Sequence, residues 1–225
     1  MLIYAHRGDQ SQFPENTIEA FAAASQYPNV GIEFDVQITQ DQQLVVFHDD
    51  ELTRLCQVNG RIADFTYAKL QCIRVKGKYA IPTLEEVLDA YTGLGRINLE
   101  IKDPKATSAV IAFLKSYQKT QPERFRLLII SSFEKQPLRD FHQAIPEVER
   151  AYLCSEVTEN TLVFLNEIQA AALHLHHEAA TPEWIEICHE NNRRLTVWTV
   201  NDLARIATLK TWGIDGIITD FPNQL

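Results

Sequence analysis

The feature that most constrains the fold of this chain is a regular alternation of short apolar bursts with helix-like stretches along most of its 225 residues. The pattern begins with the apolar "LIYAH" and the helical "ENTIEAFAAASQY", and it ends with "DLARIATLKTW" and "DGIITD". Strands that alternate with helices are typical of βαβ units with a parallel sheet. We count about eight main strands, which favours a closed (β/α)₈ TIM barrel over a doubly wound open sheet.

One segment interrupts this rhythm, from residue 49 to about residue 80. Loops longer than about 12–15 residues inside a compact domain usually carry a function or have structure of their own. We therefore expect a small insertion after the second strand region, which caps one end of the barrel. No linker or repeat divides the chain, so residues 1–225 are predicted to form a single domain.

The charge balance narrows the range of partners. The formal net charge is −9, which argues against generic nucleic-acid binding, because such binding depends on Lys and Arg meeting phosphates. No apolar run approaches the roughly 20 residues that span a bilayer, so no stable membrane insertion is expected. If the substrate is a small anionic molecule, a metal ion or a few placed cations must attract it locally.

The four cysteines are far apart and form no C-x-x-C pair: Cys56, Cys72, Cys154 and Cys188. Reduced thiols in a cytosolic protein fit this pattern better than a disulfide framework or a zinc site. The first residues, "MLIYAH", resemble a strand and have neither the basic nor the apolar region of a signal peptide. We expect a cytoplasmic location.

Acidic side chains occupy one face of two otherwise apolar strands. In "GIEFDVQ", Glu33 and Asp35 share a face, because side chains alternate along a strand. In "RINLEIKD", Asn98, Glu100 and Lys102 share the face opposite the apolar residues. Burying such groups is costly unless they have a role, so we expect them to point into the barrel near the ends of their strands.

Two histidines end apolar strands as well, His6 after "LIYA" and His48 after "LVVF". The C-terminal ends of barrel strands meet at one rim, where the active site of such barrels lies. The three carboxylates of Glu33, Asp35 and Glu100 would repel one another at this rim unless a cation compensates. A hard divalent ion, Mg²⁺ or Ca²⁺, suits an all-carboxylate set better than zinc does.

Two further patterns have competing interpretations. Trp198 in "VWTVN" either lines the pocket or belongs to the barrel core. "HLHHE" resembles a metal cluster, but strand alternation places His174 and His176 on one face and His177 on the other. No cysteine lies close by to complete a zinc set, so we interpret this stretch as a polar strand end and loop.

The motifs taken together resemble a known family, the glycerophosphodiester phosphodiesterases. The resemblance covers nearly the whole chain and is carried, in order, by "HRG", "PENT", "GIEFDVQITQDQQLVVFHDDELTR", "IPTLEEVL", "NLEIK", "WTVN" and "DGIITDFP". It implies a (β/α)₈ barrel with a small insertion after the second catalytic histidine. The short chain is similar to the cytosolic type of the family.

The resemblance also implies a role for each matching residue. His6 and His48 would be the general acid and base, Glu33, Asp35 and Glu100 would bind one divalent metal ion, and Arg7 and Lys102 would hold the substrate phosphate. The sequence does not distinguish the acid from the base. The expected reaction is hydrolysis of a glycerophosphodiester to sn-glycerol 3-phosphate and an alcohol, through attack by the substrate's own 2-hydroxyl.

Two other functions remain open at this point. A lysophospholipase D cleaves the same bond in a substrate that keeps one acyl chain, and it would need an apolar groove or an amphipathic surface element. A non-catalytic barrel that binds a phosphoester would be expected to have lost a histidine or a carboxylate, and none is missing here.

Overall fold

Eight parallel strands close into a barrel in the computed structural model, which describes all of residues 1–225. The hydrogen-bonded order is β1–β9–β8–β7–β6–β5–β4–β2, and β1 also pairs with β2, so the sheet closes on itself. The TIM barrel expected from the sequence is confirmed, and the open-sheet alternative is excluded. The barrel strands are β1 Leu2–His6, β2 Val30–Ile38, β4 Ile97–Ile101, β5 Leu128–Ser132, β6 Glu149–Cys154, β7 Ala172–His176, β8 Arg194–Trp198 and β9 Gly216–Thr219.

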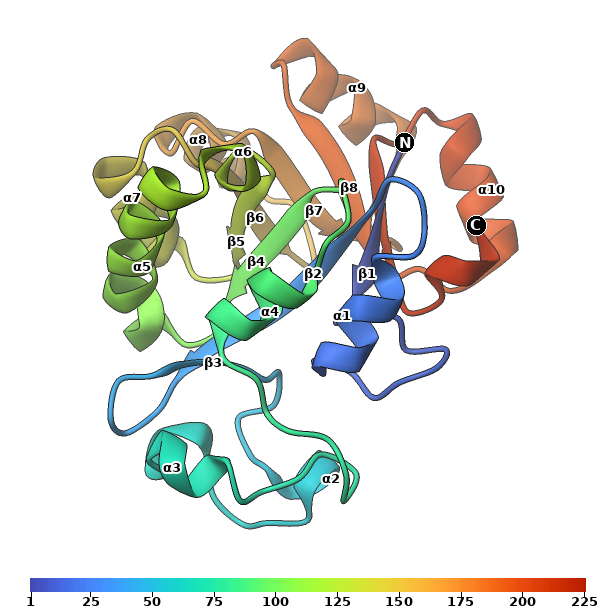
Figure 1. Ribbon diagram of the computed structural model, residues 1–225. Coiled ribbons are helices and arrows are strands. Elements are labelled where there is room, and N and C mark those ends of the chain that lie inside the picture. The colour runs from blue at the N-terminus through green and yellow to red at the C-terminus, as the bar shows by residue number, and fades with distance from the viewer.

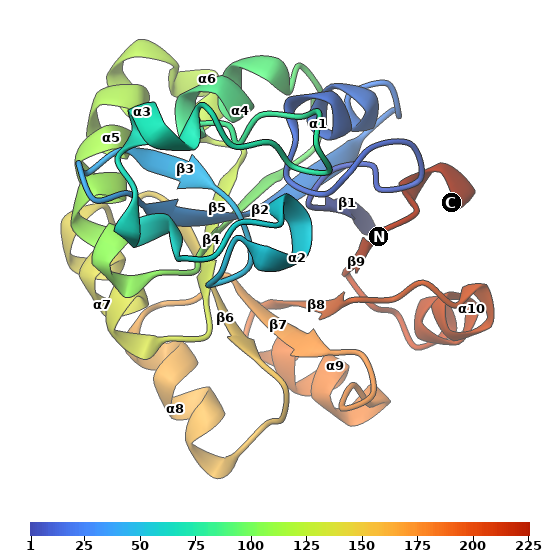
Figure 2. The same cartoon turned by 90° about the horizontal axis from the view of Figure 1, so that it is seen from below.

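Helices surround the barrel and cover the outer face of its sheet (Figures 1 and 2). Their apolar sides and the outward side chains of the strands form one cluster of 44 buried residues, which is the main hydrophobic core. The α-helices are α1 Ile18–Ala24, α2 Thr53–Cys56, α3 Tyr67–Leu70, α4 Leu84–Ala90, α5 Thr107–Thr120, α6 Pro122–Phe125, α7 Lys135–Ala144, α8 Glu159–Glu167, α9 Pro182–Glu190 and α10 Leu203–Thr211. Three 3₁₀ helices complete the set: η1 Ile62–Asp64, η2 Pro104–Ala106 and η3 Pro222–Gln224. No helix combines the length and the apolar character needed to cross a membrane.

The ninth strand, β3 Leu44–Val46, does not belong to the barrel wall. It runs antiparallel to the end of β2, with Val36 opposite Val46. The sequence predicts "LVVFH" as one more strand that ends at the rim, whereas the long β2 extends past the rim and β3 turns the chain back. This hairpin returns His48 to the level of Asp35, whose carbonyl accepts from the backbone N–H of Phe47 (3.0 Å).

The segment between β3 and α4 forms a layer over the C-terminal ends of the barrel strands, where Figure 1 shows α2 and α3 below the barrel. It contains α2, η1 and α3. Together with two residues of the β3 hairpin it has a small apolar core of its own, made of Val45, Phe47, Leu52, Leu55, Ile62, Leu70, Val75 and Ile81. A separate core lets this segment keep its shape while it rests on the rim.

Candidate active site

His6 lies at the end of β1, and its ring is held by a carboxylate from the far end of the chain. Nδ1 of His6 lies 2.6 Å from Oδ1 of Asp220, which directly follows β9. Gln10 and Asn201 each donate a side-chain hydrogen bond to the Asp220 carboxylate, both at 2.7 Å. Burial alone would raise the pKa of Asp220, but the hydrogen bonds from His6 and Asn201 outweigh burial and lower it. An ionised Asp220 holds the proton on Nδ1, so Nε2 is the atom of His6 that faces the barrel mouth, 4.0 Å from Glu33.

His48 is held in the same manner from the opposite side. Its Nδ1 lies 2.7 Å from Oδ1 of Asp49, and its Nε2 lies 3.0 Å from Nζ of Lys102. Because the Lys102 ammonium can only donate, Nε2 accepts and the ring is neutral. Burial is the main cause that lowers the pKa of His48, and the nearby charges of Arg7 and Lys102 act in the same direction. Both histidines thus line one cavity with their Nδ1 atoms anchored by carboxylates, and Nε2 of His48 is shared with Lys102.

Arg54, from α2 of the insertion, joins two loops of the rim. Its Nε and Nη2 lie 2.6 and 2.8 Å from the Asp49 carboxylate, and its Nη1 and Nη2 lie 2.7 and 2.9 Å from the Glu15 carboxylate. Glu15 in turn accepts from Nη1 of Arg7 at 2.6 Å. The hydrogen bonds from Arg54 are the largest cause that lowers the pKa of Asp49, to about 2. This chain of ion pairs connects Arg7 with His48 through the insertion.

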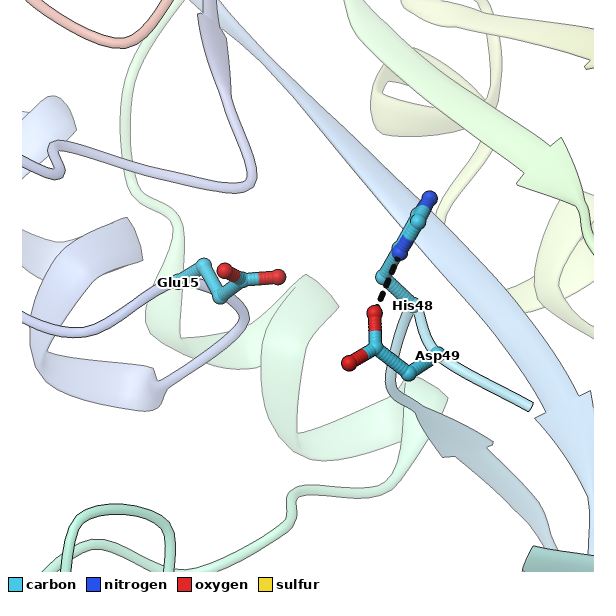
Figure 3. A group of neighbouring side chains, drawn as sticks. All are labelled: Glu15, His48 and Asp49. Carbon is cyan, nitrogen blue, oxygen red and sulfur yellow. Dashed lines mark hydrogen bonds and ion pairs between the residues drawn. The ribbon is translucent and has the colours of Figure 1, made fainter. Parts of the chain in front are cut away.

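Figure 3 shows Glu15, His48 and Asp49, with the carboxylate of Glu15 on one side and the hydrogen-bonded pair of His48 and Asp49 on the other. Their ligand atoms lie within 4.8 Å of one another, a spacing compatible with a metal ion. The guanidinium of Arg54, however, already bridges the two carboxylates. We therefore interpret this group as an ion-pair network.

A second acidic group is made of Glu33, Asp35 and Glu100, whose carboxylate oxygens also lie within 4.8 Å of one another. All three are buried on the inner face of β2 and β4, where Asp35 and Glu100 are direct partners in the register. Burial, and after it the neighbouring carboxylates, raises the pKa of Glu33 and of Glu100. Three buried carboxylates that destabilise one another in this way are a donor set that fits a hard divalent cation.

The "HRG" turn places Arg7 against these carboxylates. Arg7 has a left-handed backbone (φ 58°), and its N–H donates to Oε2 of Glu33 at 3.1 Å while Nε lies 3.4 Å from Oδ2 of Asp35. Gly8 follows with φ 88°, and a Cβ added there would lie 2.6 Å from Cβ of Ala20. Glycine is therefore required where the turn passes over α1.

Neighbouring residues of the "PENT" motif have different structural roles. Thr17 is the N-cap of α1 and accepts from the N–H of Ala20. Asn16 instead adopts a left-handed backbone (φ 56°) and donates from Nδ2 to Oδ2 of Asp35 at 3.0 Å. Glu15 is the carboxylate that bridges Arg7 and Arg54. One short motif thus starts a helix and orients two groups of the rim.

These side chains enclose a cavity of about 160 Å³ at the C-terminal end of the barrel. Its charged wall contains most of the residues named from the sequence: His6, Arg7, Glu33, His48, Glu100 and Lys102. Its apolar wall is made of Phe133, Leu153, Trp198 and Ile218, and Asn98 and Thr199 complete the lining. Trp198 therefore lines the cavity, with its ring edge-to-face against Phe133 at 5.3 Å. Asp35 lies behind the lining, in the acidic group.

The interpretation of "HLHHE" as a polar strand end is wrong for His174. This ring is fully buried inside the barrel, and neither nitrogen has a hydrogen-bond partner. Burial lowers its pKa to about 3, so it is neutral. His176 and His177 lie at the end of β7 and beyond it, where His176 packs edge-to-face on Trp198.

Four side chains that orient the site were not assigned a role from the sequence: Glu15, Asp49, Arg54 and Asp220. Each lies inside a motif quoted above, since Glu15 belongs to "PENT", Asp49 and Arg54 to "FHDDELTR" and Asp220 to "DGIITDFP". Asp49 is the next residue after His48, so its contact is local. For Glu15, Arg54 and Asp220 the spacing along the chain does not show the contacts, because these form only when the barrel closes and the insertion folds.

Comparison with known proteins places this architecture in a family. Residues 6–224 match the model of the glycerophosphoryl diester phosphodiesterase family. The chain belongs to this family. It is 34% identical to a glycerophosphodiester phosphodiesterase of Bacillus altitudinis, over 99% of this chain and 95% of that protein. It is 35% identical to a glycerophosphodiester phosphodiesterase of Caldanaerobacter subterraneus, over 100% of this chain and 96% of that protein.

Solved structures agree with this membership in the glycerophosphoryl diester phosphodiesterase family. The barrel superposes on an Oleispira antarctica phosphodiesterase in complex with the product sn-glycerol-3-phosphate, with a TM-score of 0.91 and 27% identity. The match covers 100% of this chain and 94% of that one.

Proposed function

We propose that this chain is a metal-dependent phosphodiesterase that hydrolyses glycerophosphodiesters to sn-glycerol 3-phosphate and an alcohol. The observation that carries the proposal is the pairing of His6 with Asp220 and of His48 with Asp49 around one cavity, beside three buried carboxylates. The names of the Bacillus and Caldanaerobacter relatives, and the product in the Oleispira structure, support a glycerophosphodiester as the substrate.

The acidic group is proposed as the metal site. Glu33, Asp35 and Glu100 would hold one Mg²⁺ or Ca²⁺ ion, because all three offer hard oxygen ligands within 4.8 Å of one another, and because burial and the neighbouring carboxylates raise the pKa of Glu33 and of Glu100. When bound, such an ion offsets charge on the phosphoryl oxygens and lowers the pKa of a bound hydroxyl. Arg7 and Lys102, on the charged wall of the cavity, would hold the phosphate.

The two histidines are proposed to move protons in a two-step reaction. In the first step the substrate's 2-hydroxyl oxygen bonds to phosphorus and the bond to the leaving alcohol breaks, which gives a cyclic glycerol phosphate. One histidine takes the proton of the 2-hydroxyl and the other gives a proton to the alcohol. In the second step water opens the ring while the same groups act in reverse. The cavity lining offers no cysteine or serine as a nucleophile, which supports attack by the substrate itself.

The insertion is proposed to act as a cap that orders the rim within a single domain. Arg54 connects it to Asp49 and Glu15, so the position of His48 depends on the cap being folded. A cytoplasmic location stays a prediction of the sequence, with which the four free cysteines agree.

The proposal is tested by incubating the purified protein with the glycerophosphodiesters of choline, ethanolamine and glycerol and assaying sn-glycerol 3-phosphate. Turnover should require Mg²⁺ or Ca²⁺. A choline diester that lacks the 2-hydroxyl should bind and resist cleavage. If none of the three diesters is cleaved with either metal, the proposed function is wrong, and if the deoxy substrate is cleaved at a comparable rate, only the cyclic route is wrong.

A further inference from the structure

Asn98 is an unusual residue for the floor of this cavity. Its side chain lines the cavity and is 1% exposed, and neither Oδ1 nor Nδ2 has a hydrogen-bond partner. It lies on the inner face of β4, level with Glu33 of β2 and two residues before Glu100. At about 3.3 Å of rise per residue, its Cα lies roughly 6–7 Å before that of Glu100 along β4, and so deeper in the barrel. Buried amides in folded proteins almost always have partners, and for Asn98 the partner, a water molecule or a ligand group, would enter from the cavity.

We propose that Asn98 binds the terminal hydroxyl of the substrate's glycerol moiety and thereby selects substrates in which this hydroxyl is free. The inference rests on the proposed function and goes beyond it to substrate class. Arg7 and Lys102, which would hold the phosphate, directly follow the ends of β1 and β4 and therefore lie nearer the rim than Asn98. The leaving alcohol exits at the mouth, where Phe133 is 38% exposed. The part of the substrate that points inward is therefore the glycerol.

The chemistry of the floor matches one hydroxyl group. The 2-hydroxyl attacks phosphorus in the proposed reaction, so the terminal hydroxyl is the group of the glycerol that remains to contact Asn98. A carboxamide both donates and accepts, as a hydroxyl does. Leu153 and Ile218 lie in the same lining and offer apolar contact to the glycerol carbons.

The same geometry separates two substrate classes. In a lysophospholipid the terminal oxygen carries an acyl chain instead of a hydrogen. A cavity of about 160 Å³ is smaller than the ~300–1,000 Å³ of pockets that take drug-sized ligands. An acyl chain on the oxygen that faces Asn98 would have to continue into the packed barrel. A human lysophospholipase D is 35% identical to this chain, but the match covers only 44% of this chain and 35% of that protein. This partial likeness gives no ground for assigning an acylated substrate to the present chain.

The experiment compares two phosphodiesters of choline, one with glycerol and one with propane-1,2-diol. The second lacks the terminal hydroxyl and keeps the 2-hydroxyl. The wild type should prefer the glycerol diester by about 10–100-fold in kcat/KM, as expected for one hydrogen bond to a buried partner. Asn98→Leu, of similar shape, should bring this ratio close to one by slowing the glycerol diester only. The matched control is Ser131→Ala, which removes a buried, unpartnered hydroxyl that does not line the cavity and should leave the ratio unchanged.

Several results would overturn the proposal. If Asn98→Leu keeps the wild-type ratio, another group such as Thr199 recognises the hydroxyl. If it weakens Mg²⁺ binding in calorimetry and leaves the ratio unchanged, Asn98 serves the metal site. Cleavage of lysophosphatidylcholine by the wild type at a rate comparable to glycerophosphocholine would also contradict it.

A binding measurement keeps this inference separate from the proposed function. Wild type and Asn98→Leu are titrated with sn-glycerol 3-phosphate and with propane-1,2-diol 1-phosphate. The wild type should bind the former about 10–100-fold more tightly, and the variant should bind both alike. Equal affinities in the wild type would refute the role of Asn98 even if no diester were hydrolysed.

Discussion

Nδ1 of His6 and Oδ1 of Asp220 lie 2.6 Å apart, although 214 residues separate them in the chain. They meet because β1 pairs with β9, so the closure of the barrel brings its first and last strands together. His48 obtains its carboxylate differently, from the next residue along the chain. The first histidine is therefore oriented by the closure of the barrel. The second is oriented by a local turn, in which Gln37 Nε2 donates to the carbonyls of Phe47 and Asp49, and by Arg54 of the insertion, which holds the Asp49 carboxylate.

Asp220→Asn tests the pairing with His6. Asparagine keeps the shape of the side chain and removes the charge that holds the proton on Nδ1. We expect kcat to fall by about 10²–10⁴-fold, the range attributed to a positioned acid or base, while the far-UV circular dichroism is unchanged. The matched control is Asp215→Asn. Asp215 directly precedes β9 and pairs with another histidine, His189, at 2.9 Å. Equal losses in both variants would show that the effect is structural.

The acidic group should lower the stability of the metal-free protein. Glu33→Gln removes one of three buried, mutually repelling carboxylates while it keeps the side-chain shape. In the presence of a chelator, the variant should melt at a higher temperature than the wild type. With saturating Mg²⁺ the order should reverse, because the variant has lost a ligand. A wild type that gains no stability from Mg²⁺ or Ca²⁺ would contradict the proposed metal site.

Arg54→Ala tests the link between the cap and the rim. The variant leaves Glu15 and Asp49 without their shared partner, and we expect kcat to fall at least about tenfold, a change of roughly 1.4 kcal/mol in the barrier. Added guanidinium at non-denaturing concentration should restore part of the activity, which would not follow from misfolding. Lys69→Ala removes an exposed cation of the same insertion, on α3, and serves as the control. Equal losses in both variants, with no rescue, would show that Arg54 does not position the site.

His174 should make the protein acid-sensitive. Its pKa is about 3 in the folded state against 6.5 for the unperturbed ring. Between these values the unfolded chain binds a proton that the folded chain does not, so the free energy of unfolding decreases as the pH falls from 6.5 towards 3. The slope from this one group is roughly 1 kcal/mol per pH unit. His174→Gln should reduce this slope in urea unfolding between pH 6 and 4. A slope identical to that of the wild type would show that the ring is protonated in the folded state.

The sequence predicts the barrel well because its main determinant is local. Apolar bursts and amphipathic stretches alternate along most of the chain, and strands linked by helices close in few ways. The inward carboxylates also follow from the sequence, since alternation along one strand places Glu33 and Asp35 on the same face. Nothing local, however, shows that "LVVFH" runs antiparallel, because the direction of β3 depends on how far β2 extends beyond the rim.

Contacts between distant segments are the part that the sequence does not predict. Asp220 reaches His6 only in the closed barrel, and Arg54 reaches Glu15 only after the insertion has folded on its own apolar core. For His174 the local sequence is misleading. Its polar neighbours in "HLHHE" indicate an exposed strand end, whereas its inward register position in β7, beside Thr196 of β8, buries it completely.

The most direct test of the central claim, that His6 and His48 act together on one phosphodiester bond, is kcat for glycerophosphocholine in His6→Ala, His48→Ala and the double variant, with Mg²⁺ affinity measured in parallel. Each single variant should lose about 10²–10⁴-fold in kcat. The double variant should lose little more than either, because residues that act as a unit are not additive, and Mg²⁺ affinity should be unchanged in all three. A single variant that keeps more than about a tenth of the wild-type kcat, a barrier change of less than ~1.4 kcal/mol, would contradict the claim.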